Sequence, residues 1–160
     1  MTSRSGIGFD VHPLVEARPL ILGGVTIPFE KGLAGHSDGD VLVHAVIDAM
    51  LGGAGLGDIG THFPSTDARY QGIDSTHLLR KTVELLARHQ WQASYVDATI
   101  LAERPVLKPF MCQMRQTLAA SLGLGTESVN LKATTTDGLG FVGRGEGIAS
   151  LAVATVEQVA

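Results

Sequence analysis

Apolar and polar residues follow two spacings along the chain, one typical of strands and one typical of helices. Alternating or β-branched segments predict strands over residues 6–12, 20–22, 25–27, 93–102, 129–135 and 148–156. Apolar residues three and four apart predict helices over about 39–51, 74–89 and 107–122. Together these elements predict an α/β or α+β sandwich, in which helices cover one face of a single four- to five-stranded sheet.

Turn and cap signals predict where several of these elements end. Gly23–Gly24 should join the two short strands as a hairpin. Ser37 and Asp40 have the spacing of an acidic capping box that opens the first helix, and Gly52–Gly53 is expected to end it. Residues 51–66 are rich in Gly, Asp and Pro, so we expect a loop there with at most a short turn of helix.

Length and composition limit the class of protein. With 160 residues, 44% hydrophobic and 18% charged, the chain is expected to fold as one domain over residues 1–160. Twelve basic against 16 acidic residues give a net charge of −4 without a basic face, so nucleic acid is not an expected partner. No apolar run reaches about 18 residues, so no membrane span is predicted. A single cysteine excludes an intrachain disulfide, and residues 1–6 lead into no signal-peptide core, so we expect a cytoplasmic location.

Three residues that are separated in the sequence offer metal-ligand chemistry. Asp10 and His12 are two apart on a predicted strand, so their side chains share a face. His44 lies in an otherwise apolar helical segment, where Asp40 and Asp48 form a polar stripe with it. Two imidazoles and one carboxylate match the three protein ligands of a catalytic zinc. The alternatives are a simple Asp10–His12 hydrogen bond and a histidine satisfied within the core.

Three segments carry groups that suit phosphate. Residues 36–40 place a histidine, a hydroxyl and backbone N–H groups at a predicted helix start, where anions bind well. Residues 139–147 hold four glycines around Arg144 but match neither the Walker A nor the dinucleotide pattern. Thr134–Asp137 adds hydroxyls and a carboxylate at a strand end. Plain helix capping, a bulge or oligomer contact, and ordinary strand residues are the respective alternatives.

Five sequence blocks, in one order, resemble a known family. They are Gly8–His12, Ala34–Asp40, Leu56–Gly60 with Phe63–Pro64, Lys132–Thr136, and Gly143–Gly147. The ordered set is similar to the 2-C-methyl-D-erythritol 2,4-cyclodiphosphate synthase family over almost the whole chain. Each block alone is a weak signal, whereas the ordered set is highly specific.

The resemblance implies an enzyme of non-mevalonate isoprenoid biosynthesis. Its substrate would be 4-diphosphocytidyl-2-C-methyl-D-erythritol 2-phosphate, a cytidine diphosphate derivative. The 2-phosphate attacks the β-phosphorus, CMP leaves, and 2-C-methyl-D-erythritol 2,4-cyclodiphosphate forms, which is formally the reaction of a phosphorus–oxygen lyase. Two other classes stay open: a metal-dependent phosphoesterase acting on a nucleotide-linked substrate, and a non-catalytic nucleotide-binding module.

The resemblance also implies roles for individual residues. Asp10, His12 and His44 match the ligands of Zn²⁺, or of another divalent transition metal, with a substrate phosphate oxygen as the fourth ligand. His36 and Thr135 match the catalytic positions that stabilise the transition state. Contacts to the phosphates, the methylerythritol wall and the cytidine pocket are expected from Ser37, Asp58, Ile59, Gly60, Phe63, Pro64, Ser65, Thr66, Asp67, Ala102, Glu103, Arg104, Pro105, Val106, Leu107, Lys108, Thr134, Thr136, Asp137, Phe141 and Arg144.

Three positions depart from the family pattern. Asp137 stands where relatives often have a glutamate that binds a second divalent ion, Mg²⁺ or Mn²⁺. Because it is one methylene shorter, its contact with the ion can become water-mediated. Val106 replaces a lysine of many relatives, and Lys108 lies two residues further on. Ser65 replaces an acidic residue of some relatives.

The family further implies a homotrimer whose sheets face the three-fold axis and whose active sites lie between subunits. A sheet covered on one face only would expose an apolar face, which trimerisation covers. Phe9 and Phe141 are then expected to point toward the axis. Three copies of Arg144 would form a ring there that holds a phosphate or the diphosphate of an isoprenoid. The alternative is an ion pair of Arg144 with Glu146 or Asp137 at the subunit interface.

Overall fold

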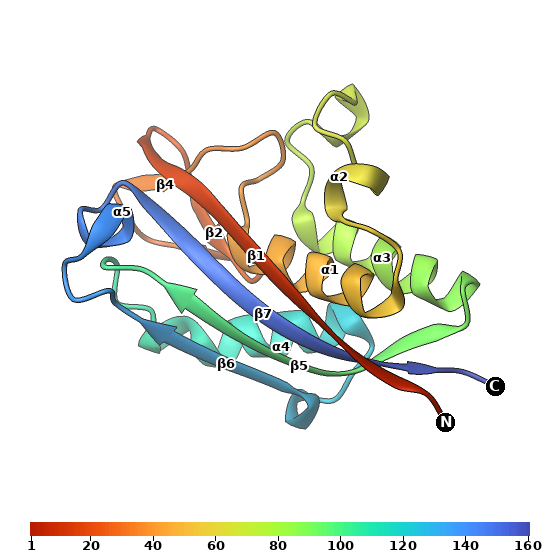
Figure 1. Ribbon diagram of the computed structural model, residues 1–160. Helices are drawn as coiled ribbons and strands as arrows, with labels where there is room; N and C mark the ends of the chain where they lie inside the picture. The colour runs from red at the N-terminus through yellow and green to blue at the C-terminus, as the bar shows by residue number, and fades with distance from the viewer.

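A mixed five-stranded sheet forms the frame of the protein, which the computed structural model describes over all residues 1–160 (Figure 1). Its strands lie in the order β4–β1–β7–β5–β6, and the β5–β6 pair is parallel whereas the other pairs are antiparallel. The strands are β1 Ser3–Glu16, β4 Lys31–Leu33, β5 Trp91–Leu101, β6 Val129–Thr134 and β7 Gly147–Gln158. A separate hairpin pairs β2 Leu20–Leu22 with β3 Val25–Ile27, as predicted. The sheet confirms the α+β prediction, although the short edge strand β4 has no signal in the sequence pattern.

Three long helices cover one face of this sheet, as predicted. They are α1 Val41–Ala54, α3 Ser75–Arg88 and α4 Met111–Leu122, and in Figure 1 all three lie behind the strands. Short helical segments occupy the connections: α2 Ile59–His62, η1 Ala68–Tyr70, η2 Lys108–Phe110, η3 Thr126–Ser128 and α5 Gly140–Gly143. The segment over 139–147, expected as an open glycine loop, therefore contains the helical turn α5. The core between sheet and helices is almost entirely aliphatic, which agrees with the aromatic content of 5%.

The first turn of α1 is held by Asp40. Its carboxylate accepts the Val43 N–H at 3.1 Å, and it accepts the N–H groups of Gly23–Gly24 at 2.9 and 2.7 Å. Asp40 is fully buried, and burial, together with the charge of Asp38, raises its pKa to about 6 despite these bonds. The predicted capping box is therefore wrong. Asp40 caps the helix, and the Ser37 side chain turns toward His44 instead.

The other end of α1 also differs from the prediction. The helix continues through Gly52 and Gly53 and ends at Gly55, which has a left-handed φ of 73°. A Cβ atom at Gly53 would lie 3.0 Å from Val156 Cγ2 on β7, so this glycine serves close packing of the helix on the sheet. A pair of glycines normally weakens a helix. Burial against β1 and β7 outweighs that preference here.

Strand β1 approaches α1 through two glycines of its own. A Cβ atom at Gly6 would lie 2.0 Å from Ala49 O, and one at Gly8 would lie 1.9 Å from Ala45 O. Neither position has room for any side chain, because the neighbouring atoms belong to the helix backbone. The two glycines therefore set the distance between β1 and α1.

The opposite face of the sheet carries no helix and is largely apolar along β1 and β7, whereas Asp97 and Lys132 form an ion pair on its β5–β6 side. Its large side chains come from β1, β5 and β7 and are 39–72% exposed: Ile7, Phe9, Val11, Tyr95, Leu151 and Val153. Phe9 pairs with Leu151 and Ile7 with Val153, so these residues form one patch, here called the apolar sheet face. A patch of this kind marks a surface for association.

None of the helices has both the length and the apolar character that a membrane crossing requires.

Candidate metal centre

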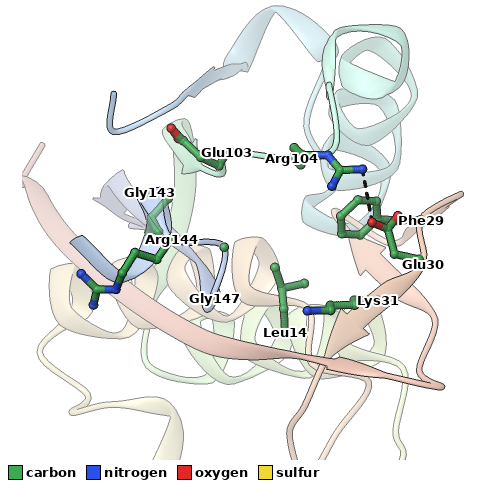
Figure 2. Close-up of a pocket in the computed structure, with 11 residues that line it drawn as sticks. Leu14, Phe29, Glu30, Lys31, Glu103, Arg104, Gly143, Arg144 and Gly147 are labelled. Carbon is green, nitrogen blue, oxygen red and sulfur yellow. Dashed lines mark ion pairs between the residues drawn. The ribbon is translucent and has the colours of Figure 1, made fainter. Parts of the chain in front are cut away.

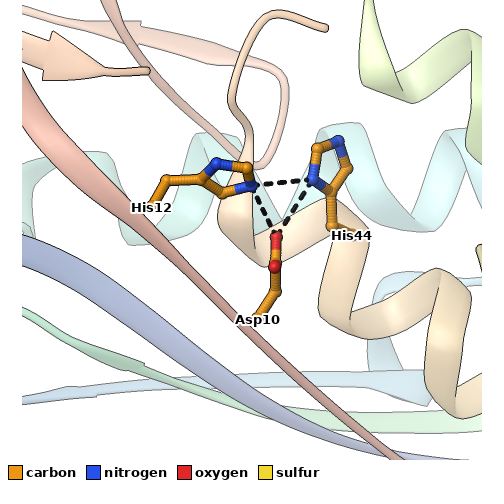
Figure 3. A group of neighbouring side chains, drawn as sticks. All are labelled: Asp10, His12 and His44. Carbon is orange, nitrogen blue, oxygen red and sulfur yellow. Dashed lines mark hydrogen bonds and ion pairs between the residues drawn. The ribbon is translucent and has the colours of Figure 1, made fainter. Parts of the chain in front are cut away.

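Asp10 and His12 on β1 and His44 on α1 converge at one point (Figure 3). His12 Nε2 and His44 Nδ1 lie 2.8 and 3.0 Å from Asp10 Oδ2, and the two nitrogens are 3.2 Å apart. Side chains two apart on a strand share a face, and on β1 that face is the one that packs on α1. The predicted convergence of the three residues is confirmed.

Hydrogen bonds on the far side of each imidazole leave the converging nitrogens free. His12 Nδ1 donates to Ala34 O at 2.7 Å, so the Nε2 lone pair faces the centre. His44 Nε2 lies 2.8 Å from Ser75 Oγ and 3.0 Å from Ser37 Oγ, so Nδ1 faces the centre. Both rings are thus oriented as metal-binding histidines usually are.

Asp10, His12 and His44 shift one another's pKa values. Burial favours a raised pKa for Asp10, but the hydrogen bonds and charges of His12 and His44 outweigh it and lower the pKa to about 2. Burial likewise opposes protonation of His12, but the hydrogen bond and charge of Asp10 raise its pKa above 6.5. Without a metal, the cluster therefore holds a carboxylate against a readily protonated imidazole.

The donor set fits a tetrahedral divalent ion. With Zn²⁺ bonds of 2.0–2.1 Å, neighbouring ligands of a regular tetrahedron lie about 3.3 Å apart. The three ligand atoms here are separated by 2.8–3.2 Å, so little movement is needed to seat an ion. Neutral imidazoles and a carboxylate suit zinc and several other divalent transition metals. The residues present therefore fit the metal that the sequence predicts.

These residues open onto a cleft of about 270 Å³, here called the metal cleft. Besides the three ligands, the predicted residues that line it are His36, Ser37, Ile59, Gly60, Phe63 and Ser65. Tyr70 and Leu78 complete the lining, and the rings of Phe63 and Tyr70 meet edge to face with centroids 5.5 Å apart. The cleft thus places an apolar wall opposite the polar metal group.

Other predicted residues shape this wall rather than line it. Asp58 caps α2 and Asp67 caps η1. The Asp67 carbonyl also accepts a hydrogen bond from His36 Nε2 at 2.8 Å, which fixes that imidazole at the cleft. Pro64 is half-buried and Thr66 is exposed on the loop between α2 and η1.

The three residues of the predicted polar stripe on α1, Asp40, His44 and Asp48, have different partners in the structure. Asp40 faces the β2–β3 hairpin, and Asp48 accepts the Ile59 N–H at 2.7 Å and anchors α2. Burial raises the pKa of Asp48, although the hydrogen bond from Ile59 opposes the shift. Only His44 of the stripe joins the metal group.

A second cleft of about 230 Å³, the nucleotide cleft, lies at the ends of β5 and β6. Its lining combines the predicted cytidine segment with the threonine-rich strand end: Ala102, Glu103, Pro105, Val106, Leu107, Lys108, Ala133, Thr134 and Thr135. The structure therefore brings these two segments together at one cleft. No metal ligand lines this cleft, so Thr135 and the metal residues occupy different clefts of one chain.

Glu103 holds the loop that follows β6. Its two carboxylate oxygens accept the N–H groups of Gly138 at 2.8 Å and Thr136 at 3.4 Å. Asp137 lies between them, exposed and with a left-handed φ of 55°. Phe141, on the following turn α5, is 42% exposed.

A third cleft, of about 270 Å³, lies between the Glu30–Arg104 ion pair and the glycine-rich turn over 143–147 (Figure 2). Arg104 pairs with Glu30 at 3.2 Å. Arg144 pairs with Glu146 at 3.1 Å, and Figure 2 shows its guanidinium directed away from the Glu30–Arg104 pair. The Arg144–Glu146 pair is therefore formed within a single chain, and Asp137 has no part in it.

Two residues next to the metal group are not indicated by the sequence. From the sequence, Asp38 is expected in a polar loop and Ser75 at the start of a helix, and nothing indicates that they are neighbours. In the structure Ser75 Oγ lies 2.5 Å from Asp38 Oδ1 and 2.8 Å from His44 Nε2. The contact joins segments 31 and 37 residues apart, which no local spacing can reveal.

The fold and site define an α+β protein with a mixed sheet and a His–His–carboxylate centre between its first long strand and first helix. The sequence profile of the YgbB family matches residues 3–157, and the chain belongs to this family. The resemblance found from the ordered sequence blocks is thereby confirmed.

Named relatives agree with this assignment. The 2-C-methyl-D-erythritol 2,4-cyclodiphosphate synthase of Thiobacillus denitrificans is 57% identical over 155 residues, which is 97% of each chain. The bifunctional IspDF from Campylobacter jejuni has a TM-score of 0.94 and 42% identity over 98% of this chain, which spans 42% of that longer protein. A 2C-methyl-D-erythritol-2,4-cyclodiphosphate synthase solved in a CDP-bound form has a TM-score of 0.88 and 34% identity, over 96% of this chain and all of that chain.

Proposed function

We propose that this chain converts 4-diphosphocytidyl-2-C-methyl-D-erythritol 2-phosphate to 2-C-methyl-D-erythritol 2,4-cyclodiphosphate and CMP. The observation that carries the proposal is the convergence of Asp10, His12 and His44 in one cleft, in a chain 57% identical to a named synthase. The reaction belongs to non-mevalonate isoprenoid biosynthesis. The whole of residues 1–160 forms the synthase domain, and its one free cysteine suits the reducing cytoplasm.

The reaction is an intramolecular phosphoryl transfer, formally that of a phosphorus–oxygen lyase. An oxygen of the 2-phosphate forms a bond to the β-phosphorus, and the bond from that phosphorus to the CMP oxygen breaks. CMP leaves with the bonding electron pair, and no water is consumed. The protein therefore has to hold three phosphates close together and compensate their charge.

The metal cleft suits this task. Asp10, His12 and His44 would hold Zn²⁺ or another divalent transition metal, which supplies Lewis-acid stabilisation of phosphate charge and a fixed template. His36, fixed by the Asp67 carbonyl, would stabilise the transition state, and Ser37 would contact a phosphate near the start of α1.

The nucleotide cleft would hold the cytidine diphosphate part of the substrate. Backbone groups of residues 102–108 would read the base, Lys108 offers the cation that Val106 does not, and Thr135 would stabilise the transition state. Asp137 would bind the second ion, Mg²⁺ or Mn²⁺, through water, because Mg²⁺ retains water ligands readily.

The proposal requires assembly, because the two clefts of one chain are separate. A homotrimer places the nucleotide cleft of one subunit against the metal cleft of its neighbour and covers the apolar sheet face. In that trimer Phe9 lies toward the axis, with Arg144 near one end, where a phosphate or isoprenoid diphosphate would compete with Glu146 for it. Light scattering should show a trimer at micromolar concentration, and a monomer would contradict the assembly.

Phosphorus NMR of the reaction products tests the chemistry. The cyclic diphosphate and CMP should form from the cytidine diphosphate substrate, whereas a linear phosphorylated product would indicate a phosphoesterase. Replacing His44 by alanine should abolish turnover. If the wild-type protein binds cytidine nucleotide without turnover and His44→Ala leaves that binding unchanged, the protein is a nucleotide-binding module instead.

A further inference from the structure

We propose that Ser75 and Asp38 position the metal ligand His44 through a hydrogen-bonded chain that runs from a carboxylate to the imidazole. The inference rests on the metal site of the proposed function. It concerns Nε2 of His44, on the side of the ring that faces away from the ligands Asp10 and His12. Both residues act through His44 and neither is a metal ligand.

The chain joins three parts of the fold: the loop before α1, α1 itself, and the start of α3. Ser75 Oγ lies 2.5 Å from Asp38 Oδ1 and 2.8 Å from His44 Nε2. The Ser75 backbone N–H also donates to Asp38 Oδ2 at 2.9 Å. Ser75 is fully buried and His44 is 8% exposed, so solvent does not compete for these bonds. The Asp38 carboxylate therefore accepts hydrogen bonds from both the backbone N–H and the hydroxyl of Ser75, and this fixes the direction of the hydroxyl.

Donor and acceptor rules then set the position of the protons. An ionised carboxylate only accepts hydrogen bonds, so the Ser75 hydroxyl donates to Asp38. Its oxygen is left to accept the N–H at Nε2 of His44. That tautomer leaves Nδ1, the nitrogen 3.0 Å from Asp10 Oδ2, with its lone pair toward the centre. A carboxylate behind a metal-binding histidine fixes the ring and increases its basicity, and here the serine hydroxyl relays that effect.

Ser37 offers a second acceptor to the same nitrogen. Its Oγ lies 3.0 Å from His44 Nε2 and accepts the Gly39 N–H at 3.3 Å. No carboxylate contacts the Ser37 hydroxyl. Ser37 can therefore accept a hydrogen bond from the N–H of His44, but unlike Ser75 it does not connect the imidazole to a negatively charged group. Loss of the Ser75 hydroxyl should therefore weaken the metal site, and loss of both hydroxyls should weaken it further.

A purely structural role for Ser75 makes a different prediction. Ser75 is the first residue of α3, and in a purely structural role its buried hydroxyl would serve only the packing of that helix. Thr82 provides the matched control, because it lies on the same helix, is fully buried, and donates its hydroxyl to Leu78 O at 2.9 Å. Thr82→Val removes one buried hydroxyl from α3 without touching His44.

The test measures Zn²⁺ affinity by competition with a chelator, together with urea unfolding of the metal-free proteins. Ser75→Ala should bind Zn²⁺ about 10-fold more weakly than wild type, and Ser37→Ala/Ser75→Ala about 100-fold more weakly. Asp38→Asn should also lose about 10-fold, because it removes the charge but keeps an acceptor. Thr82→Val should keep wild-type affinity even where its unfolding midpoint falls as far as that of Ser75→Ala. Ser75→Thr should restore binding toward wild type.

A spectroscopic readout addresses the tautomer directly. In the Zn²⁺-loaded wild-type protein, proton–nitrogen NMR should show a slowly exchanging N–H at Nε2 of His44, and the double variant should lose that protection. Wild-type affinity in Ser75→Ala, the double variant and Asp38→Asn would overturn the proposal. If Ser75→Ala does not fold, Asp38→Asn decides, and unchanged affinity in that variant overturns it. A wild-type protein that binds no Zn²⁺ would instead overturn the metal site itself, and this proposal with it.

Discussion

Replacing Gly8 by alanine should push α1 away from β1 and open the metal centre. A Cβ atom at Gly8 would lie 1.9 Å from Ala45 O and 2.8 Å from Ala49 N. Both atoms belong to the α1 backbone, so no side-chain rotation can relieve the contact. Carbon–oxygen contacts of this kind are normally about 3.3 Å or longer, so strand and helix must separate by about 1.4 Å.

This separation reaches the metal centre because His44 directly precedes Ala45. The ligand atoms are only 2.8–3.2 Å apart, and a metal site tolerates changes of about 0.2 Å in its bond lengths. The loss of Zn²⁺ affinity should therefore exceed the roughly 10–100-fold typical of changes behind a ligand. Overpacking a core typically destabilises by about 1–3 kcal/mol, and two backbone contacts place Gly8→Ala at or above the upper end.

Gly52→Ala is the matched control for this prediction. It lies within α1, and the nearest atom to its added Cβ is Ile7 O at 3.9 Å. Alanine is favoured over glycine in a helix by about 1 kcal/mol, so this variant should be as stable as wild type or slightly more stable. Urea unfolding at one protomer concentration and Zn²⁺ competition compare the three proteins. A Gly8→Ala protein with wild-type stability and affinity would refute the packing argument.

Burial raises the pKa of Asp40 from 3.8 to about 6, so its folded form keeps a proton to higher pH than the unfolded chain. Its contribution to the free energy of unfolding should fall by about 2 kcal/mol between pH 4 and pH 6, and by about 3 kcal/mol (2.2 × 1.36) in total from pH 3 to pH 7. Urea unfolding should show this slope relative to Asp40→Asn, and parallel profiles would contradict it. Asp10 raises the pKa of His12 above 6.5, so apparent Zn²⁺ affinity should fall by up to about tenfold per pH unit below that pKa, and a chelator titration that stays flat from pH 8 to 5.5 would count against it. Phe9→Asp should abolish the proposed trimer in light scattering, whereas Ala87→Asp, at an exposed position of α3 on the helix side of the sheet, should not. A trimer that stays intact in Phe9→Asp would place the interface elsewhere.

The parts of the fold that depend on local spacing are predictable from the sequence. Asp10 and His12 share a face because side chains alternate along any strand, and the paired bonds of β1 with β7 preserve that alternation. The α3 helix follows its apolar spacing closely, and Glu84 and Arg88 lie 3.9 Å apart as their i,i+4 positions indicate. In these elements, local preference and tertiary packing favour the same conformation.

The ends of α1 fail as predictions because tertiary packing overrides local signals there. Serine is a common N-cap residue, but in the structure Asp40 rather than Ser37 caps α1. The Asp40 carboxylate accepts the Val43 N–H of the helix and also the two N–H groups of the β2–β3 hairpin. Gly52–Gly53 has the composition of a stop signal, but the helix is buried against the sheet and continues. The sequence shows which residues are available, whereas their partners depend on the fold.

The positions of Ser75 and Thr135 could not be predicted from the sequence for a second reason, which is that they depend on segments far apart in the chain. Ser75 contacts His44 only because α3 begins beside the loop that carries Asp38. Thr135 lies in the nucleotide cleft, away from the metal ligands of its own chain. The family resemblance, rather than residue spacing, is what implies that a neighbouring subunit brings the two clefts together.

Strand β1 connects the proposed assembly with the metal centre through its two-residue period. Gly6, Gly8, Asp10 and His12 face α1, where the two glycines set the approach and the other two residues meet His44. The residues between them, Ile7, Phe9 and Val11, form part of the apolar sheet face. A shift of one residue would exchange the two sets, placing glycines on the open face and bulky side chains against the helix. The pairing of β1 with β7 therefore fixes both surfaces at once, so the strand that a neighbouring subunit would cover is also the strand that positions two of the three metal ligands.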